Sequence, residues 1–232
     1  MGTEIPYAST LIIVPAYNEG SRIAKVVQSI AATGPWPVVV VDDGSTDDTA
    51  QQARQAGATV LAHLLNRGPG AATMTGLAYA KAGKYAYAVT IDGDGQHDPA
   101  DIASLLAPVV RGEADLVIGN RFMKGTNAIP RSRVWYNGMA NLTTFLFSKH
   151  WVSDTQSGLK AFGPKAINVL ELEMDGYEFC SEIIIKACRN KLRLQELPAF
   201  VRYDAASMAK GQGLVTGIKT LTNLFHHLLT RH

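Results

Sequence analysis

Two aspartates and a glutamine follow a short apolar run at residues 89–91, and a glycine follows each aspartate. These residues are Asp92, Asp94 and Gln96. Because glycine lets the chain turn and lets a ligand approach the backbone, the two carboxylates can converge on one divalent cation. Carboxylate and amide oxygens suit hard cations such as Mg²⁺ or Mn²⁺. The spacing therefore predicts a metal site at the end of a strand.

Three other structures use aspartate and glycine in similar patterns. A calcium loop of the Asp-x-Asp-x-Asp-Gly type needs glycine at its sixth position and a carboxylate at its twelfth, where this chain has His97 and Ala103. That loop is excluded. Asp98 before Pro99 is a typical helix start, which explains that aspartate alone. A solvated turn remains an alternative for Asp92 and Asp94, the two aspartates that we call the metal pair.

The segments around the metal pair alternate between predicted strands and helices. Strands are predicted at 11–14, 38–41, 59–64, 89–91 and 115–119. The run at 38–41 is apolar on both faces, as buried parallel strands are. Helical patterns follow Ser21, Asp47 and Pro99 and cover 71–82 and 131–149. Residues 183–187 fit a helix or a buried strand, and 192–201 fit a strand broken at Pro198. The alternation predicts an α/β fold, a single domain with a mostly parallel central sheet flanked by helices.

Polar turns follow four successive predicted strands. In a parallel sheet the carboxyl ends of strands share one edge, where ligands bind, so we expect these turns to form one site. Their residues are Tyr17 and Glu19, Asp42 and Asp43, a flexible loop at Gly68 and Gly70, and the metal pair. Thr73 breaks the dinucleotide fingerprint, and no phosphate loop of the Gly-Lys-Ser/Thr type occurs. Because Mg²⁺ usually keeps substrate phosphates as ligands, a nucleoside diphosphate derivative is the expected substrate.

Two later segments carry further candidate residues. Arg131 and Arg133 begin a predicted helix, where cations oppose the helix dipole, and this placement favours an anionic partner. Two ordinary surface arginines are the alternative.

A polar turn at 154–158 lies between apolar segments. Near the C-terminus, one apolar stripe contains Leu214, Ile218, Leu221, Phe225 and Leu228. Such a stripe packs on its own domain or, with its flanking cations, contacts a membrane surface or a second subunit.

Composition limits the classes of partner and compartment. The chain has 232 residues and a net charge of +2, which gives no support to nucleic-acid binding. Cys180 and Cys188 fit neither a zinc site nor a redox pair and indicate core thiols in a reducing compartment. We find no signal peptide and no apolar run of the ~20 residues that a membrane span needs. These features predict a cytoplasmic protein, with peripheral contact to the cytoplasmic membrane face left open.

Four motifs together resemble the family 2 glycosyltransferases of GT-A fold, and most of all their branch of dolichyl-phosphate mannose synthases and bacterial polyprenyl-phosphate glycosyltransferases. The motifs are PAYNE at 15–19, VDDGSTD at 41–47, DGDGQH at 92–97 and DTQSG at 154–158. The likeness covers about residues 9–210. It implies a nucleotide-sugar-binding half at about 9–130, an acceptor half at about 131–210 and a C-terminal amphipathic helix at 211–232.

The resemblance implies an inverting, metal-dependent transfer of a sugar from a nucleotide-sugar, GDP-mannose or a UDP-sugar, to a polyprenyl phosphate such as dolichyl or undecaprenyl phosphate. Residues of the donor site would be Pro15, Tyr17, Glu19, Asp42 or Asp43, with Asp92, Asp94 and Gln96 on the metal. Arg121 looks like the family's phosphate-binding arginine. Arg202, Ser207 and Lys210 look like its mobile loop over the donor, although their spacing is looser. Arg131, Arg133 and Ser157 would meet the acceptor. Pro69 departs from the Lys or Leu common in relatives.

Alternative activities stay open at this point. An acceptor hydroxyl on a saccharide or small molecule would need a general base, for which Asp154 is the candidate by family position. A lipid phosphate is already ionised and needs none, so Asp154 would then orient other groups. A nucleotidyltransferase would show a glycine- and arginine-rich loop where residues 15–19 stand. A non-catalytic binding module would require a vestigial metal pair. A membrane partner and self-association also remain open.

Overall fold

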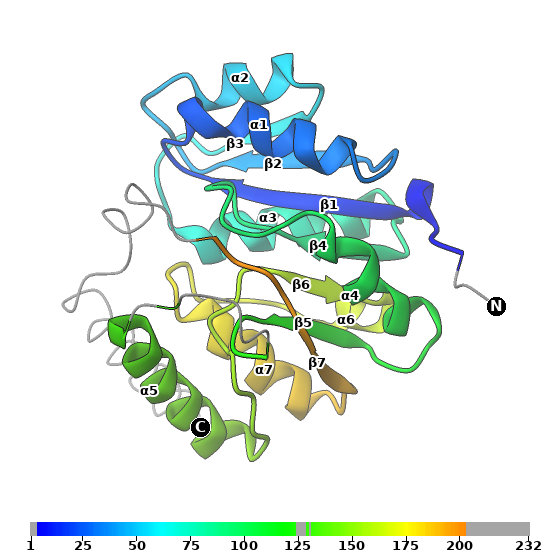
Figure 1. Ribbon diagram of the computed structural model, residues 1–232, viewed down its shortest axis with the longest axis vertical. Helices are drawn as coiled ribbons and strands as arrows, with labels where there is room; N and C mark the ends of the chain where they lie inside the picture. Colours follow the sequence, from blue (N-terminus) through cyan, green and yellow to red (C-terminus); the bar gives the residue numbers. More distant parts are fainter. Residues whose placement is uncertain (1–3, 124–128, 130, 203–232) are drawn as a thin grey trace.

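A seven-stranded sheet forms the centre of the protein in a computed structural model that describes residues 4–123, 129 and 131–202 (Figure 1). The strand order is β3-β2-β1-β4-β6-β5-β7. The strands are β1 (Thr10–Ala16), β2 (Val38–Asp42), β3 (Thr59–Ala62), β4 (Tyr87–Thr90), β5 (Leu116–Asn120), β6 (Lys160–Phe162) and β7 (Leu194–Pro198). All neighbours are parallel except β6, which runs antiparallel to β4 and β5. The predicted α/β fold with a mostly parallel sheet is confirmed.

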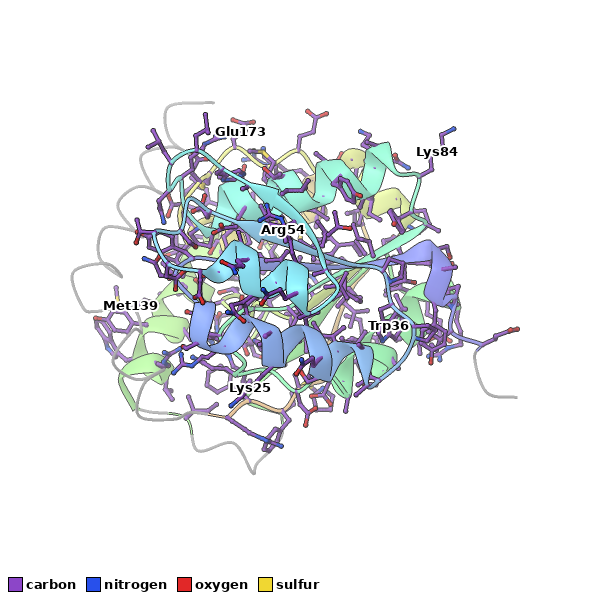
Figure 2. All side chains as sticks on the ribbon, turned by 90° about the horizontal axis from the view of Figure 1, so that it is seen from above. Lys25, Trp36, Arg54, Lys84, Met139 and Glu173 are labelled. Carbon is purple, nitrogen blue, oxygen red and sulfur yellow. The ribbon has the colours of Figure 1, made fainter. Side chains whose placement is uncertain are left out.

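Helices cover both faces of this sheet. They are α1 (Gly20–Ala31), α2 (Thr49–Gln55), α3 (Pro69–Ala82), α4 (Asp101–Val110), α5 (Arg131–Ser148), α6 (Pro164–Val169) and α7 (Phe179–Arg189), after a short 3-10 turn, Tyr7–Ser9. In β1, Ile12 and Val14 pack with α1 and α4 on one face, while Leu11 and Ile13 pack with α3 and α7 on the other. Alternate residues thus face opposite layers, and both layers are apolar, as in buried parallel strands. Lys25 on α1 and Arg54 on α2, labelled in Figure 2, are exposed.

Several predicted boundaries differ from the observed ones. The third strand ends at Ala62 and the fourth at Thr90. Helix α1 begins at Gly20, so Ser21 is not its cap; the N-cap residue is Glu19, whose side chain makes no capping bond, and Asp47 Oδ2 accepts the Gly20 N–H at 3.0 Å. Residues 183–187 belong to helix α7 and not to a strand. The sequence did not predict β6 and α6, because a three-residue strand and a six-residue helix are too short to show a period.

The antiparallel strand β6 joins the two parts of the sheet. It pairs Ala161 with Val89 of β4 and with Val117 of β5. The turn at 154–158 leads directly into β6 and is held beside the carboxyl end of β4, where the Thr90 hydroxyl donates to the Gly158 carbonyl at 2.9 Å. The fold thereby brings the turn at 154–158 next to the metal pair. Helix α5 packs outside this region against α7.

Candidate active site

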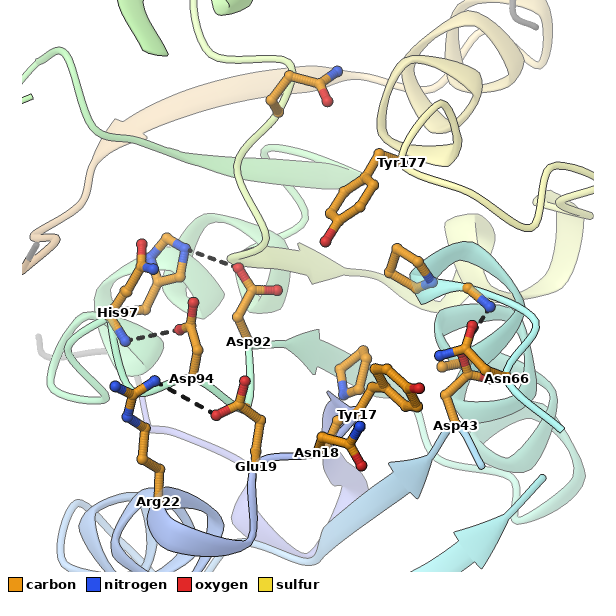
Figure 3. A pocket seen from close by; sticks show the side chains of 18 of the residues that line it. Tyr17, Asn18, Glu19, Arg22, Asp43, Asn66, Asp92, Asp94, His97 and Tyr177 are labelled. Carbon is orange, nitrogen blue, oxygen red and sulfur yellow. Dashed lines mark hydrogen bonds and ion pairs between the residues drawn. The ribbon is translucent and has the colours of Figure 1, made fainter. Parts of the chain in front are cut away.

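A pocket of about 570 Å³ lies at the carboxyl edge of β1, β2 and β4 (Figure 3). Turns after these strands, the loop before α3, the helix α5 and the segment just before α7 supply its walls. Its lining includes Pro15, Tyr17, Asn18, Glu19, Arg22, Asp43, Asn66, Gly68, Asp92, Asp94, Gln96, His97, Arg121, Arg133, Tyr136, Asn137, Gln156 and Tyr177. The structure thus gathers most of the residues that the sequence assigned to one site.

The predicted metal pair forms one wall of the pocket. Asp94 Oδ1 accepts the Gln96 backbone N–H at 2.9 Å, which turns the chain after the second aspartate. Burial and the negative charge of Asp92 raise the pKa of Asp94 to about 6. Burial also raises the pKa of Asp92, but His97, 3.6 Å away, and the charges of Lys160 and Arg121 lower it overall. Two neighbouring carboxylates that face one pocket repel each other unless a proton or a cation lies between them.

The residues present fit a hard divalent cation. Asp92, Asp94 and Gln96 offer only oxygen donors, the type that Mg²⁺ and Mn²⁺ prefer. Among the residues that the structure describes, no group of three or more His, Cys, Asp or Glu side chains could hold a metal by itself. Asp92, Asp94 and Gln96 would supply part of the coordination, and substrate phosphates could supply further ligands.

Gly158 packs against the carboxylate of Asp92. A Cβ at this position would lie 2.0 Å from Asp92 Oδ2 and 2.2 Å from Oδ1. The Asp92 carboxylate therefore lies directly over the glycine of the turn at 154–158. This contact explains why two motifs 60 residues apart in the chain belong to one site.

Glu19 lies on the metal side of the pocket and Tyr17 on the opposite side. Figure 3 shows Glu19 beside Asp94, where its Oε2 is 3.6 Å from Arg22 Nη1. Tyr17 is 45% exposed and stands near Asp43. This division leaves Tyr17 available for an aromatic base, while Glu19 and Arg22 lie with the charged groups.

Of the two aspartates that end β2, only Asp43 lines the pocket. Its carboxylate accepts hydrogen bonds from the backbone N–H groups of Arg67 and Gly68, at 3.1 and 2.6 Å, and pairs with His63 Nδ1 at 2.6 Å. Asp42 accepts the Ser45 N–H at 3.1 Å and lies outside the lining. Asp43 therefore holds the glycine loop beside the pocket.

The glycine loop packs tightly against residues 174–176. Gly68 has φ +115°, and a Cβ there would lie 2.3 Å from the Asp175 carbonyl. Gly70 donates its N–H to the same carbonyl at 2.8 Å, and Arg67 pairs with the Asp175 carboxylate at 3.1 Å. The loop that the sequence suggested was flexible is anchored on both sides, so its glycines serve close packing.

Arg121 lines the pocket, and the carboxylate of Asp154 holds it from behind. Asp154 is fully buried and lies outside the lining. Its Oδ2 accepts the Arg121 Nε–H at 2.8 Å and its Oδ1 accepts Nη2–H at 2.6 Å. The Asp154 N–H in turn bonds Glu196 at 3.1 Å. This arrangement matches the orienting role considered for Asp154 rather than direct contact with a substrate.

The remaining predicted residues lie apart from the pocket or outside the described part of the chain. Ser157 is buried, and its hydroxyl accepts the Leu159 N–H at 3.3 Å. Arg202 is exposed; its backbone N–H donates to the Gln96 carbonyl at 2.9 Å, and its Nη2 lies 3.9 Å from Asp98 Oδ2, outside the pocket lining. The Arg131 side chain, Ser207, Lys210 and the stripe at 214–228 lie outside the residues that can be described.

Several lining residues were not singled out from the sequence. His97 belongs to the DGDGQH motif but was not predicted as a site residue, although its Nε2 lies 3.6 Å from Asp92 Oδ2. Tyr136 and Asn137 come from α5, and Figure 3 shows Tyr177, just before α7, extending toward Asp92. None of these three directly follows a predicted strand, so the rule that located the other ligands could not find them.

The chain is similar to known proteins in sequence and in fold. The sequence model of the family described as "Glycosyl transferase family 2" matches residues 11–169. A UDP-N-acetylglucosamine–dolichyl-phosphate N-acetylglucosaminyltransferase of Methanococcus voltae is 35% identical over 239 residues, 94% of this chain and 94% of that relative. A polyprenol monophosphomannose synthase of Mycolicibacterium smegmatis is 28% identical over 207 residues, 83% of this chain and 77% of that relative.

A solved structure shares the fold at lower sequence identity. It is glucosyl-3-phosphoglycerate synthase from Mycobacterium tuberculosis in complex with Mn²⁺, uridine diphosphate and phosphoglyceric acid. The TM-score is 0.73 at 21% identity, with 97% of this chain and 80% of that chain covered. This likeness concerns the arrangement of helices and strands.

Proposed function

Because the chain belongs to glycosyltransferase family 2 and has the GT-A fold, we propose that it transfers a sugar, with inversion, from a nucleotide-sugar to a polyprenyl phosphate. The observation that carries this proposal is the wall formed by Asp92 and Asp94 in a pocket that also holds Arg121 and Arg133. Such a pocket offers a cation site for a diphosphate and positive charge for a second phosphate. The names of the relatives from Methanococcus voltae and Mycolicibacterium smegmatis support the acceptor class.

The proposed donor site spans two walls of the pocket. Asp92, Asp94 and Gln96 would hold Mg²⁺ or Mn²⁺, which when bound neutralises charge on the departing diphosphate. Tyr17 would stack on the base, and Pro15 would border it. Asp43 would act indirectly, since its oxygens already hold the glycine loop. GDP-mannose and UDP-sugars both remain candidate donors.

The proposed acceptor site lies toward α5. Arg133 lines the pocket there, and it would pair with the phosphate of the lipid. An ionised phosphate attacks without a general base, whereas a hydroxyl would need one within hydrogen-bond reach. The Asp154 carboxylate is turned to Arg121 and away from the pocket. This geometry favours a phosphate acceptor, with a saccharide or small-molecule hydroxyl as the second candidate.

The outer face of α5 suggests how the protein reaches a membrane lipid. Asn137, Ala140, Asn141 and Thr144 are buried, while the opposite face exposes Val134, Trp135, Leu142, Phe145 and Leu146. Trp151 is 56% exposed and packs edge-on against Phe145, with ring centroids 5.9 Å apart. Exposed tryptophans beside apolar residues are typical of surfaces that enter the lipid headgroup region. We therefore include peripheral membrane contact through α5 in the proposal.

No helix among the described residues is both long and apolar enough to cross a bilayer. A reversible contact through α5 would not require one. Self-association through the same apolar face is the alternative use of this surface, and the stripe at 214–228 would be a further contributor to either.

The proposal is tested by a transfer assay with Mn²⁺ or Mg²⁺ and a panel of GDP- and UDP-sugars, with and without a short-chain polyprenyl phosphate. Product that forms only with the lipid phosphate would support the proposal and identify the donor. Donor binding without transfer to the lipid would favour a hydroxyl acceptor. Failure of every nucleotide-sugar to bind would contradict the proposed function.

A further inference from the structure

Two polar atoms of α5 are buried at the pocket wall without a hydrogen-bond partner among the residues that the structure describes. They are the hydroxyl oxygen of Tyr136 and Oδ1 of Asn137, and both residues line the pocket. Buried polar atoms in folded proteins are nearly always hydrogen-bonded, because an unpaired one costs free energy. These two atoms, which lack hydrogen-bond partners and belong to residues that line a pocket, therefore point to a ligand that supplies the missing bonds.

The orientation of the Asn137 amide is fixed by its other end. Its Nδ2 donates to the Ser153 carbonyl at 2.8 Å, and the residue is only 4% exposed. A carbonyl oxygen accepts hydrogen bonds and donates none, so the nitrogen of the amide must face Ser153. Oδ1 is consequently the atom of the amide that is left without a partner.

Asn141, one turn further along α5, holds the same carbonyl but has all its hydrogen bonds within the protein, and it serves as a comparison. Its Nδ2 donates to the same Ser153 carbonyl at 2.7 Å. Its Oδ1 accepts the Thr155 N–H at 3.1 Å and the Thr155 hydroxyl at 2.9 Å. Asn141 is thus satisfied at both ends within the protein, while Asn137, which holds the same carbonyl and lines the pocket, has an Oδ1 without a partner among the described residues.

The chemistry of these atoms selects the class of ligand. An amide oxygen accepts only, so it binds an O–H or N–H group and repels a phosphate. The Tyr136 hydroxyl both donates and accepts, which suits the hydroxyl of a sugar. We infer that Tyr136 and Asn137 bind the sugar ring of the nucleotide-sugar, and that they set which sugar the protein accepts. This inference rests on the proposed function, because it deepens the donor assignment of the same pocket.

The division of the pocket agrees with this assignment. The wall with Tyr17 and the glycine loop suits a nucleoside, and the wall with Asp92 and Asp94 suits a metal-bound diphosphate. Tyr136 and Asn137 lie on a third element, α5, which also carries Arg133 of the proposed acceptor site. Both sugars of the donor carry uncharged hydroxyls, but the ribose belongs to the nucleoside at the first wall, so the hexose is the part left for α5. It is the part that matches the two unpaired atoms.

Tyr136→Phe is the decisive variant, because it removes one oxygen and keeps the ring that packs on Trp135, with centroids 5.5 Å apart. Calorimetry with Mn²⁺ should compare a nucleotide-sugar with the matching nucleoside diphosphate, UDP or GDP. We expect the affinity for the nucleotide-sugar to fall at least tenfold, while the affinity for the diphosphate changes less than twofold. The double variant with Asn137→Ala should lose more, again for the nucleotide-sugar alone.

Asn141→Ala is the matched control, since it removes hydrogen bonds that lie within the protein. It should lower the melting temperature without changing the ratio of the two affinities. Equal losses for both ligands in Tyr136→Phe, or no loss, would overturn the inference. So would a selective loss of affinity for a short-chain polyprenyl phosphate, which would assign the atoms to the acceptor. Wild-type protein that binds no nucleotide-sugar would instead overturn the proposed function, and the inference with it.

Discussion

Arg121 holds both carboxylate oxygens of Asp154, through Nε at 2.8 Å and Nη2 at 2.6 Å, and the backbone N–H of Arg121 bonds the same carboxylate at 2.9 Å. The Asp154 side chain is fully buried and that of Arg121 is 10% exposed. A two-point contact of this kind fixes the plane of the guanidinium. The arginine therefore reaches the pocket wall in one orientation before any ligand arrives.

Asp154→Asn should destabilise the protein strongly. The amide keeps the shape of the side chain but removes the charge, which leaves a buried guanidinium without its counter-ion. Removing one partner of a buried ion pair typically costs about 3 to 5 kcal/mol. We expect the free energy of unfolding in urea to fall by that order. If the variant is as stable as wild type yet inactive, Asp154 contributes to the reaction directly, and its role as general base should be tested.

Asp94→Ala should abolish metal-dependent donor binding. This carboxylate is one of two that form the proposed cation site, and its loss leaves a single charge there. We expect the affinity for Mn²⁺ in the presence of UDP or GDP to fall about 100-fold or more. Asp98→Asn is the control, because Asp98 lies outside the pocket lining and accepts the Ala100 N–H at 3.0 Å. Unchanged Mn²⁺ binding in Asp94→Ala would contradict the metal assignment.

Gly158→Ala should weaken metal binding although residue 158 carries no ligand atom. The new methyl group would lie 2.0 Å from Asp92 Oδ2, so the carboxylate must move. Gly138→Ala on α5 is a suitable control, since a Cβ there meets nothing within 4 Å. We expect Mn²⁺ affinity to fall at least tenfold in the first variant and to stay constant in the second. Equal affinities would show that Asp92 is not held over Gly158.

Stability at acid pH should depend on Asp115. Hydrogen bonds from Arg193 lower the pKa of this carboxyl to about 2, from an ordinary value of 3.8. A group whose pKa is lower in the folded state stabilises the protein above its unfolded pKa, and the stabilisation is lost as the pH falls toward the folded pKa. Asp115 should therefore contribute about 1 to 2 kcal/mol above pH 4, after allowance for the exposed arginine.

This contribution is measured by urea denaturation between pH 2 and pH 6. Wild type should lose stability relative to Asp115→Asn as the pH falls from about 4 to 2, and the two curves should converge there. Asp115 and Arg193 directly precede β5 and β7, whose first paired residues are Leu116 and Leu194. A constant difference over the whole range would show that the pair adds no pH-dependent stability.

Leu142→Glu with Leu146→Glu should reduce binding to anionic lipid vesicles. These leucines are 55% and 48% exposed on the outer face of α5, so charges there oppose entry into the headgroup region without disturbing the core. Leu64→Glu with Leu65→Glu is the control, because these leucines are exposed but lie outside α5. We expect vesicle sedimentation to fall at least fivefold in the first double variant only. A change from dimer to monomer with unchanged vesicle binding would assign the face to self-association.

The sequence predicted the first part of the sheet well because each strand there is a run of apolar residues that ends in a polar turn. The four strands before Asp92 and the turns that follow them needed no further information. The same rule located Tyr17, Asp43 and the metal pair. Parallel strands between helices make pattern and position agree.

The later part could not be predicted because its pattern is interrupted. Strand β6 has three residues and includes Lys160, which is 1% exposed, so its sequence does not look like a core strand. Helix α5 places Asn137 on one side and Leu142 on the other, and neither residue type signals a ligand. Only the packing of α5 and α7 around the pocket gives Tyr136, Asn137 and Tyr177 their positions.

The antiparallel strand β6 has a consequence for how the protein is made. Thr90 and Gly158 meet although 68 residues separate them, and contacts this distant in the chain form late in folding. During synthesis, β1 to β4 leave the ribosome well before β6 does. Asp92 consequently lacks the glycine against which its carboxylate packs until the chain has passed residue 158. The ability to bind a divalent cation with a nucleotide would thus report that the chain has been made at least as far as β6. A shorter chain would not bind the donor.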